Sequence, residues 1–541
     1  MPGAAPLLRR LRSSVPTWAL CAEGHWNQLR LAGEALAAAG PDREMLRAGL
    51  DLLLWGFLTR PLEPSLAGPL LALHGKAPVV PAGLLPALRA LAALPPGTDD
   101  PAWPEWEYLR DAEDPAAAAG FLRPRLADPG SGLAWLGRAW DCLAGLGAWD
   151  HLADLLAAAD LSGPLAPLAS RLAAEIAMYR EGPEAARAAL LALDPALWGP
   201  WREQRAARCA QLAGDLESAR SGLAAAHSRL PWHPNLLLVR HALARPLPAP
   251  PVPTDARAAV GLYSWNNAAR LGPTLEALEA SDLGPARVLL LDNGSGDDTA
   301  ALLAAAAGRL GRDRAEVVRL PVNVGAPAAR NWLLALPAAR DADWVAFVDD
   351  DALPPRDWLG RMLAAGAAHP ATGAVGSRIV DAARPSALQS VDVHLMPPPA
   401  EGPHIEFLDG LSGLPDAGLY DYVRPCLSVT GCLHLLRRSA LDAAGAFDIR
   451  FSPSQLDDFE RDLRAFLAGI PCLYLGTLAV RHHQASAQGL RQSPARQGNA
   501  RGNLFKLSHL HPRQNAARAA ARDLDLAWDD LLAKAEELET P

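Results

Sequence analysis

The most constraining feature of this sequence is a short apolar run that ends in three consecutive carboxylates. Residues 344–348 predict a buried strand, and Asp349, Asp350 and Asp351 follow at its carboxyl end. Open α/β sheets bind ligands outside the carboxyl ends of their strands. Three neighbouring acids repel one another there, so a divalent cation that carries a diphosphate is the natural counter-charge. The alternative is a solvated acidic turn that caps the next helix.

The composition divides the chain near residue 250. With 541 residues the chain is long enough for two or three domains, and the proline-rich segment 246–255 predicts a linker. Residues 1–245 are rich in Ala, Leu and Arg at helical spacing and predict an all-α domain. From 256 to 510, short β-rich runs alternate with helical stretches, which is typical of an α/β domain. Residues 511–541 predict a C-terminal amphipathic helix that packs on the domain or on a second subunit of a homodimer.

Glycine-containing turns recur in the first half. Gly147, Gly182 and Gly214 each precede a fresh helical run, at roughly the 34-residue period of helix-turn-helix repeats. The pattern resembles a tetratricopeptide-type solenoid, and such arrays present surfaces that hold peptides or partner proteins. The alternative is that these helices only brace the second domain or form a dimer contact.

Charge and cysteine usage exclude several classes of protein. The net charge of −9 argues against a nucleic-acid binder, because phosphate backbones require clustered Lys and Arg. The six cysteines show no metal-ligand spacing, which predicts reduced, buried thiols in a cytoplasmic protein. No window of about 18 uncharged apolar residues occurs, so we expect no transmembrane span.

Further polar clusters follow predicted strands of the second half. Runs 259–263 and 288–291 predict two strands, and a polar loop near residue 325 leads into a helix. Together with the acidic triplet, all these clusters fall at one edge of a single predicted parallel sheet, which independent turns would not explain. The residues at this edge are Tyr263, Ser264, Trp265, Asn266, Asp292, Asn293, Asn323, Gly325, Arg330, Asp349 and Asp350.

The ordered segments resemble the family-two glycosyltransferases of the GT-A fold. The resemblance covers roughly residues 256–510 and rests on the order of its motifs. These are Asp-Asn-Gly-Ser from Asp292, Asn-x-Gly and Ala-Arg-Asn around Arg330, and an Asp-x-Asp-type strand end at 349–351. Trp265 stands where the family has tyrosine. The resemblance implies an α/β, Rossmann-like domain that binds a nucleotide-sugar, with the eleven residues above on the donor side.

The later motifs extend this resemblance. Gly431 and Cys432 lie in a segment similar to the acceptor side of the family, and residues 456–464 resemble its helix that supplies the general base. The resemblance implies Asp458 as the base, although Asp457 replaces the usual Glu and leaves open which acid acts. The alternative is a solvated helix face.

The resemblance implies a metal-dependent, inverting glycosyltransferase of the hexosyltransferase type. Mn²⁺ or Mg²⁺ would be held by Asp351, with Asp349 or Asp350, and by one of the strand-end histidines His482 and His483. Asp292 would accept a hydrogen bond from the nucleotide base while Trp265 packs on it. Arg330 would pair with a phosphate, position its loop, or form a structural ion pair.

Substrates remain open at this stage. A UDP-sugar is the favoured donor, although uracil, thymine and guanine all fit the pattern. The acceptor is a peptide or protein, a glycan, a lipid-linked intermediate or a small natural product. A catalytically inactive scaffold is the main alternative. A nucleotidyltransferase fits less well, because no glycine-rich signature with Arg and Lys lies near the first strand.

Overall fold

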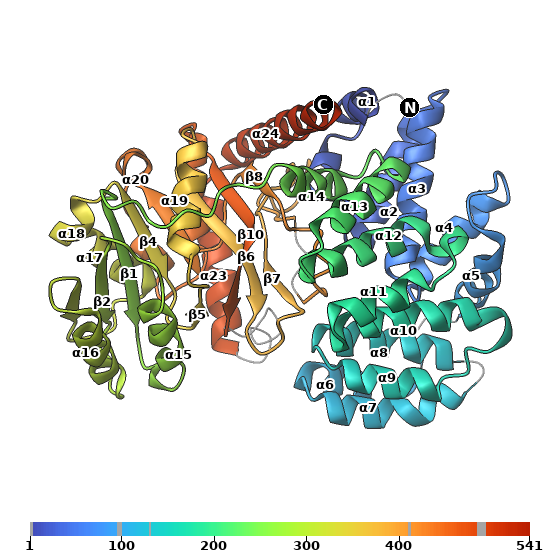
Figure 1. The fold of residues 1–541 in the computed structure, drawn as a ribbon, viewed down its shortest axis with the longest axis horizontal. Helices are drawn as coiled ribbons and strands as arrows, with labels where there is room; N and C mark the ends of the chain where they lie inside the picture. The colour runs from blue at the N-terminus through green and yellow to red at the C-terminus, as the bar shows by residue number, and fades with distance from the viewer. Residues whose placement is uncertain (1–3, 95–99, 129–130, 409–412, 484–493, 541) are drawn as a thin grey trace. The chain divides into compact units, whose positions relative to one another are not determined.

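A computed structural model of the chain describes residues 4–94, 100–128, 131–408, 413–483 and 494–540. The chain divides into two compact units. Unit 1 comprises Met1–Ala244, Gly413–Leu419 and Leu531–Pro541, and unit 2 comprises Arg245–Ser412 and Tyr420–Asp530. Figure 1 shows that the described part of unit 1 is helical, whereas unit 2 is built on a sheet.

Unit 1 is held together by apolar helix faces. One core cluster is built around Trp106, Trp135 and Leu143, which are almost completely buried. Its α-helices are α1 (Ala4–Ser14), α2 (His25–Ala39), α3 (Arg43–Thr59), α4 (Pro64–His74), α5 (Leu85–Ala92), α6 (Trp103–Ala112), α7 (Pro115–Leu122), α8 (Gly132–Gly145), α9 (Trp149–Ala158), α10 (Ala166–Arg180), α11 (Pro183–Leu191), α12 (Pro195–Leu212), α13 (Leu216–Arg229) and α14 (Pro234–Ala244).

The three glycines of the sequence pattern lie between consecutive helices. Gly147 separates α8 from α9, Gly182 separates α10 from α11, and Gly214 separates α12 from α13. Gly147 and Gly214 have φ values of 66° and 81°, a backbone region that L-residues with a side chain rarely adopt. The helix-turn-helix pairs are therefore present, and their tetratricopeptide character stays a prediction.

Unit 2 contains one ten-stranded sheet with a main strand order of β3-β2-β1-β4-β9-β6-β10-β5. In addition, β7 pairs with β6 and β8 pairs with β10. The strands are β1 (Ala258–Ser264), β2 (Arg287–Asp292), β3 (Ala315–Arg319), β4 (Trp344–Val348), β5 (Ala352–Leu353), β6 (Ala374–Asp381), β7 (Leu388–Ser390), β8 (Val423–Cys426), β9 (Leu433–Arg437) and β10 (Cys472–His482).

The sheet is mixed, so the expectation of a single parallel sheet is only partly right. Strands β1 to β4 pair in parallel, as predicted for the strands that deliver the polar clusters. Strand β9, however, is antiparallel to both of its neighbours, β4 and β6. The amino end of β9 therefore lies beside the carboxyl end of β4. This places residues 431 and 432 at the edge where the polar clusters gather.

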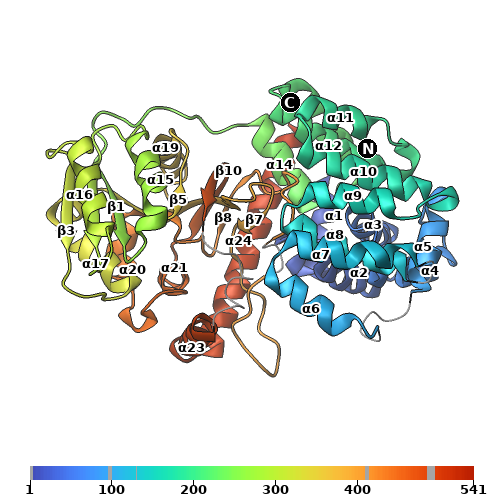
Figure 2. The same ribbon diagram turned by 90° about the horizontal axis from the view of Figure 1, so that it is seen from below.

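Helices cover both faces of the sheet (Figure 2). Apolar residues of α15, α16 and α19 form one core cluster with alternate residues of β1, β2 and β4, such as Val260, Leu262 and Val348. Helices α17, α20 and α21 lie on the other face. The bounds are α15 (Ala268–Glu279), α16 (Thr299–Leu310), α17 (Ala326–Ala335), α18 (Pro337–Arg340), α19 (Trp358–Ala368), α20 (Arg438–Ala444), α21 (Asp457–Leu467), α23 (Pro494–Leu510) and α24 (Arg513–Glu539).

The last helix, α24, has one apolar face. Its buried residues follow the i, i+3, i+4 spacing of an amphipathic helix. They are Ala516, Ala519, Ala520, Asp523, Leu524, Ala527, Trp528, Leu531 and Ala535. Within the residues that the structure describes, no helix is both long enough and apolar enough to cross a membrane.

Candidate functional site

Asp349 and Asp350, the first two acids after β4, point in different directions. Gly261 of β1 is level with Phe347 of β4, and successive side chains of a strand point to opposite faces. Asp350 accepts a hydrogen bond from the Ser264 hydroxyl at the end of β1. Asp349 instead lies 3.3 Å from Nη2 of Arg330. Asp349 and Asp350 therefore have different partners, and the three acids do not form a single cluster of charge.

Arg330 links the end of β4 to the start of α21. It lies in α17 and is buried, with Nη1 2.7 Å from Oδ2 of Asp457 and Nη2 3.3 Å from Oδ1 of Asp349. Its guanidinium also lies 5.4 Å from the ring centre of Tyr263 and 5.3 Å from that of Phe447. Among the roles considered for Arg330, the structure shows the ion pair, which joins two acidic groups over 100 residues apart in sequence, and its pairing with a phosphate stays a prediction.

Helix α21 presents its first two acids differently. Asp457 is buried in its ion pair with Arg330, and burial raises the pKa of its carboxyl to about 6 despite the nearby guanidinium. Asp458 is half-buried, and its Oδ2 accepts a hydrogen bond of 2.6 Å from the backbone N–H of Gly431. Asp458 is thus the more accessible of the two acids.

The alternative of a solvated helix face is wrong for α21. Four of its charged side chains are buried, namely Asp457, Glu460, Arg461 and Asp462. The residues just before the helix, Gln455 and Leu456, have φ values of 81° and 63°. Such a conformation costs free energy for residues other than glycine and is concentrated at functional sites.

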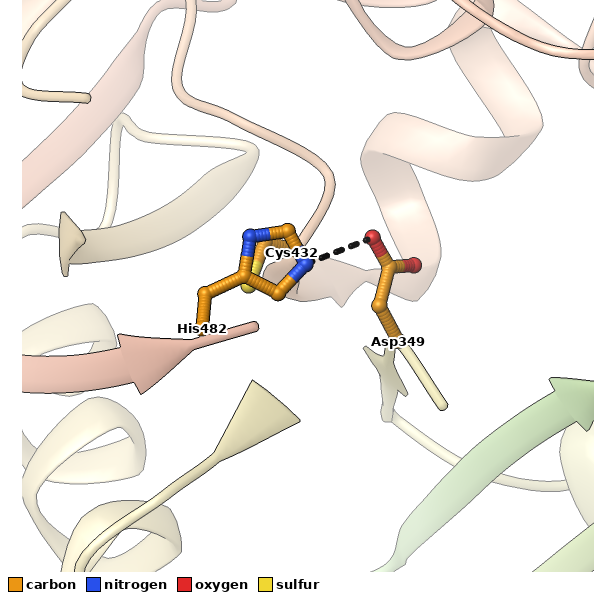
Figure 3. A group of neighbouring side chains, drawn as sticks. All are labelled: Asp349, Cys432 and His482. Carbon is orange, nitrogen blue, oxygen red and sulfur yellow. Dashed lines mark ion pairs between the residues drawn. The ribbon is translucent and has the colours of Figure 1, made fainter. Parts of the chain in front are cut away.

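His482, at the end of β10, brings an imidazole to the acidic triplet (Figure 3). Its Nε2 lies 2.8 Å from Oδ1 of Asp351 and 3.9 Å from Oδ2 of Asp349. On the other side of the ring, Nδ1 is 3.0 Å from Oε1 of Gln389 in β7. His483 contributes its backbone N–H to the carbonyl of Asp351, 3.0 Å away. The structure therefore groups His482, rather than His483, with these carboxylates.

Cys432 completes a possible ligand set with Asp349 and His482. One ligand atom from each of the three residues lies within 4.8 Å of the other two. The backbone N–H of Asp349 also donates to the carbonyl of Cys432, at 2.9 Å. The thiol is buried, and burial raises its pKa. The acceptor-side role of Cys432 stays a prediction, and in the structure its side chain lies beside Asp349 and His482.

The acidic triplet is not a solvated turn, and its surroundings shift the pKa values of Asp350 and Asp351 in opposite directions. The side chains of Asp349 and Asp351 are only 25% and 13% exposed. Burial raises the pKa of Asp350 to about 7, with repulsion from the neighbouring acids adding to it. Burial opposes the charge on Asp351, but the hydrogen bond and charge of His482, together with the charges of Arg270 and His483, lower its pKa. The alternative of a helix-capping turn also fails because the next helix begins only at Trp358.

Asp292 is a fully buried acid at the end of β2. Its Oδ1 accepts a hydrogen bond of 3.0 Å from the backbone N–H of Ser295. Its Oδ2 lies 3.2 Å from Nε of Arg319 but accepts no hydrogen bond within the described residues. A buried carboxylate oxygen without a donor is costly, so Oδ2 is suited to receive an N–H from a ligand. Trp265, the residue directly after β1, is 50% exposed.

The loops around Asp292 are fixed by side-chain amides. Asn293 donates to Oδ1 of Asn323 at 2.9 Å, and the same oxygen accepts from the N–H of Gly325 at 2.8 Å. Gly325 has φ 84°, and a Cβ there would lie 2.7 Å from Oγ of Ser452. Asn266 also has positive φ and accepts from the N–H of Gly296 at 2.8 Å. These candidate residues therefore shape the loops by local hydrogen bonds.

Two residues at the site were missed by sequence reasoning. Gln389 holds the ring of His482, and Arg319 lies against Asp292. Gln389 belongs to a three-residue strand without any motif, so no sequence signal marks it. Arg319 could have been found, because it is level with Asp292 in the parallel pair of β3 and β2. That inference requires β3 to be recognised as a strand.

Comparisons with known proteins bear on the second unit. Residues 260–407 match the profile of the family described as Glycosyl transferase family 2. Among curated proteins, none matches this sequence.

Several solved structures are similar to parts of this chain. The mannosyltransferase PcManGT from Pyrobaculum calidifontis, in complex with GDP-Man and Mn²⁺, is 18% identical over 62% of this chain and 85% of its own, with a TM-score of 0.36. TarS from S. aureus is 16% identical over 43% of this chain and 38% of its own, with a TM-score of 0.31. GalNAc-T7 with UDP, GalNAc and Mn²⁺ is 13% identical over 42% of each chain, with a TM-score of 0.33. At such low TM-scores these likenesses do not bear on the chemistry of this chain.

Proposed function

We propose that this chain, whose residues 260–407 match the profile of glycosyl transferase family 2, moves a sugar from a nucleotide-diphosphate donor to an acceptor hydroxyl and inverts the anomeric centre. The observation that carries the proposal is the double ion pair of Arg330. It joins Asp349, at the end of β4, to Asp457, at the start of α21. Donor-side acids and a candidate base are thereby held in one site.

The acid–histidine group fits a divalent cation, Mn²⁺ or Mg²⁺. Asp351, Asp349 and His482 supply oxygen and nitrogen donors, and Nε2 of His482 lies 2.8 Å from Oδ1 of Asp351. Gln389 fixes the imidazole ring from behind. When bound, the cation would neutralise the negative charge that develops on the leaving diphosphate.

Asp292 is the residue that we assign to the nucleotide base. Its buried Oδ2, which lies 3.2 Å from Nε of Arg319, can accept an N–H of the base, and Nε of Arg319 is a donor that can meet a carbonyl. One acceptor beside one donor matches the N–H and C=O of uracil, so a UDP-sugar is the favoured donor. The half-exposed ring of Trp265 can pack on the base.

Asp458 is the residue that we assign as general base. Its Oδ2 is oriented by the N–H of Gly431, and its carboxylate remains partly accessible, so it can take the proton of an acceptor hydroxyl. Asp457 is less suited, because its carboxylate is buried against Arg330. We therefore assign Asp457 to positioning Arg330.

Two isosteric variants test this division of roles. Asp458→Asn should lower transfer by at least about 100-fold while donor binding persists, because a general base contributes about 10²–10⁴-fold. Asp457→Asn should destabilise unit 2 by about 3 kcal/mol, since it leaves the buried Arg330 short of a partner. Transfer assays, donor binding and denaturant unfolding of both variants separate the two effects. Wild-type transfer by the Asp458 variant would overturn the base assignment.

For unit 1 we propose recruitment or orientation of the acceptor, which is a peptide, a protein, a glycan or a small natural product. The support is that its helices build a separate core and resemble repeats that bind such partners. Hydrogen exchange of the full chain with candidate acceptors should show protection of backbone amides in α8–α13. Protection confined to unit 2 would instead leave unit 1 with a bracing role.

A further inference from the structure

We propose that the thiolate of Cys432 is a ligand of the divalent cation, so that the site favours a thiophilic or borderline ion over Mg²⁺. The inference rests on the proposed function for what the cation does in transfer. It goes further in naming a sulfur ligand and a metal preference.

The antiparallel insertion of β9 places this sulfur at the site. Val348 of β4 is level with Leu433 of β9, so the residues just beyond them, Asp349 and Cys432, lie side by side. Their backbones are joined by the hydrogen bond from the Asp349 N–H to the Cys432 carbonyl. His482 arrives from the end of β10, and the three side chains converge (Figure 3).

The hydrogen bonds of Gln389 fix which nitrogen of His482 faces the group. The Gln389 amide donates from Nε2 to the backbone carbonyl of His482 at 3.1 Å, which orients its oxygen toward the ring. That oxygen lies 3.0 Å from Nδ1, so Nδ1 carries the hydrogen. Nε2 is then the nitrogen that faces Asp349, Asp351 and Cys432, and a metal ion would bind there in place of its proton.

The donor set predicts the kind of ion. Mg²⁺ prefers oxygen ligands in an octahedron, whereas thiolate and imidazole ligands suit Zn²⁺ and related ions. Ligands at the observed separation of up to 4.8 Å need only a modest contraction to meet one ion. Binding replaces the proton of the thiol, so that one S–metal bond forms and one H⁺ is released to solvent. With Asp351, Asp349 and His482, Cys432 makes four protein ligands, so a six-coordinate ion would keep two positions for a diphosphate.

Burial alone does not distinguish Cys432 from the other buried cysteines of unit 2. Cys426 and Cys472 are equally buried in the same unit, yet neither belongs to a group of three metal-ligating residues within the described part of the chain. Cys426 therefore serves as a matched control, because its replacement changes a buried thiol without touching the acid–histidine group.

Cobalt absorption tests the proposal directly. Co²⁺ is added to the full-length protein with a nucleoside diphosphate, and a thiolate-to-cobalt charge-transfer band is sought in the near ultraviolet. We expect the band in the wild type and in Cys426→Ser, and its loss in Cys432→Ser with the visible Co²⁺ bands retained. Cys432→Ser should also weaken Cd²⁺ binding by at least about tenfold, the loss typical of even an outer-shell partner, and leave Mg²⁺ binding unchanged.

Three results would overturn the proposal. They are visible Co²⁺ bands without charge transfer in the wild type, a charge-transfer band that survives in Cys432→Ser, or no Co²⁺ binding at all. Thermal shift with nucleotide-sugars, measured on the same samples, distinguishes these failures from failure of the proposed function. Donor binding with an oxygen- and nitrogen-only metal site would leave the transferase intact and remove only the sulfur ligand.

Discussion

Gly431 lies against both Asp458 of the acid helix α21 and Arg330. A Cβ at this position would lie 2.8 Å from Oδ2 of Asp458 and 2.9 Å from Nη2 of Arg330. Both distances are shorter than real Cβ contacts, and both groups belong to the site. The absence of a side chain at residue 431 therefore permits the close approach that orients the candidate base.

Gly431→Ala should therefore lower the rate of transfer strongly and the free energy of unfolding only moderately. The added methyl must displace Asp458 or Arg330, which we expect to cost about 1–3 kcal/mol in unfolding free energy. Because Asp292 is not touched, donor binding should persist. Transfer kinetics, donor affinity and denaturant unfolding of the variant check these expectations.

The chain offers a matched control in α16. Gly308 is exposed, and a Cβ there meets nothing within 4 Å. Gly308→Ala should leave transfer unchanged and raise stability by roughly 0.5–1 kcal/mol, because alanine is the better helix former. Equal transfer by Gly431→Ala and Gly308→Ala would contradict the account of residue 431.

At the scale of elements, strands β1, β2 and β4, each of which ends in polar residues, could be predicted from the sequence. Strand β9, which runs antiparallel inside the sheet, could not. Strand β4 occupies the predicted residues, and β1 and β2 extend the predicted runs by one or two residues. Each has a continuous apolar run whose polar end marks its boundary. The run of β9, by contrast, contains a histidine and an arginine. Only its pairing with β4 and β6 makes it a strand, and that pairing is not visible locally.

Helix α24 contributes a buried acid to an ionic cluster in unit 2. Asp523 lies 2.9 Å from Nδ1 of His394, whose Nε2 lies 3.0 Å from Asp392. Tyr422 donates to Asp392 at 2.9 Å, and Arg424 lies 3.9 Å from the same acid. Burial opposes the charge on His394, but the two carboxylates prevail and raise its pKa to about 9.

This cluster predicts a loss of stability at alkaline pH. The pKa of His394 in the folded state lies above its unfolded value of 6.5, so its stabilisation is complete below pH 6.5 and is lost as pH rises through about 9. The shift corresponds to about 3 kcal/mol of unfolding free energy. Denaturant unfolding of the wild type and of His394→Gln between pH 6.5 and 9.5 measures it.

Comparing the wild type with His394→Gln separates the titration of His394 from that of other groups that titrate between pH 6.5 and 9.5. His394→Gln should be less stable than the wild type at pH 6.5, and the difference should shrink by pH 9.5. A difference that stays constant across this range would show that His394 is not charged in the folded protein.

At the scale of the whole molecule, the sequence nominated the residues of the candidate site but not the contacts between them. The polar strand ends, the acids of α21 and His482 were all nominated from motifs that follow one another along the chain. Their contacts were not, because Asp457 is 127 residues from Arg330 and Gln389 is 93 residues from His482. Long-range side-chain pairs of this kind leave no periodic pattern. The choice between His482 and His483 therefore needed the structure.

The most direct test of the central claim is a panel of nucleotide-sugars with Mn²⁺ or Mg²⁺, in which thermal shift and release of nucleoside diphosphate are followed together. We expect one donor, a UDP-sugar, to raise the melting temperature only when a divalent cation is present, since binding to the folded state stabilises it. Slow release of UDP should accompany this shift. The absence of any shift or release with every donor would contradict a transferase and favour a scaffold without turnover.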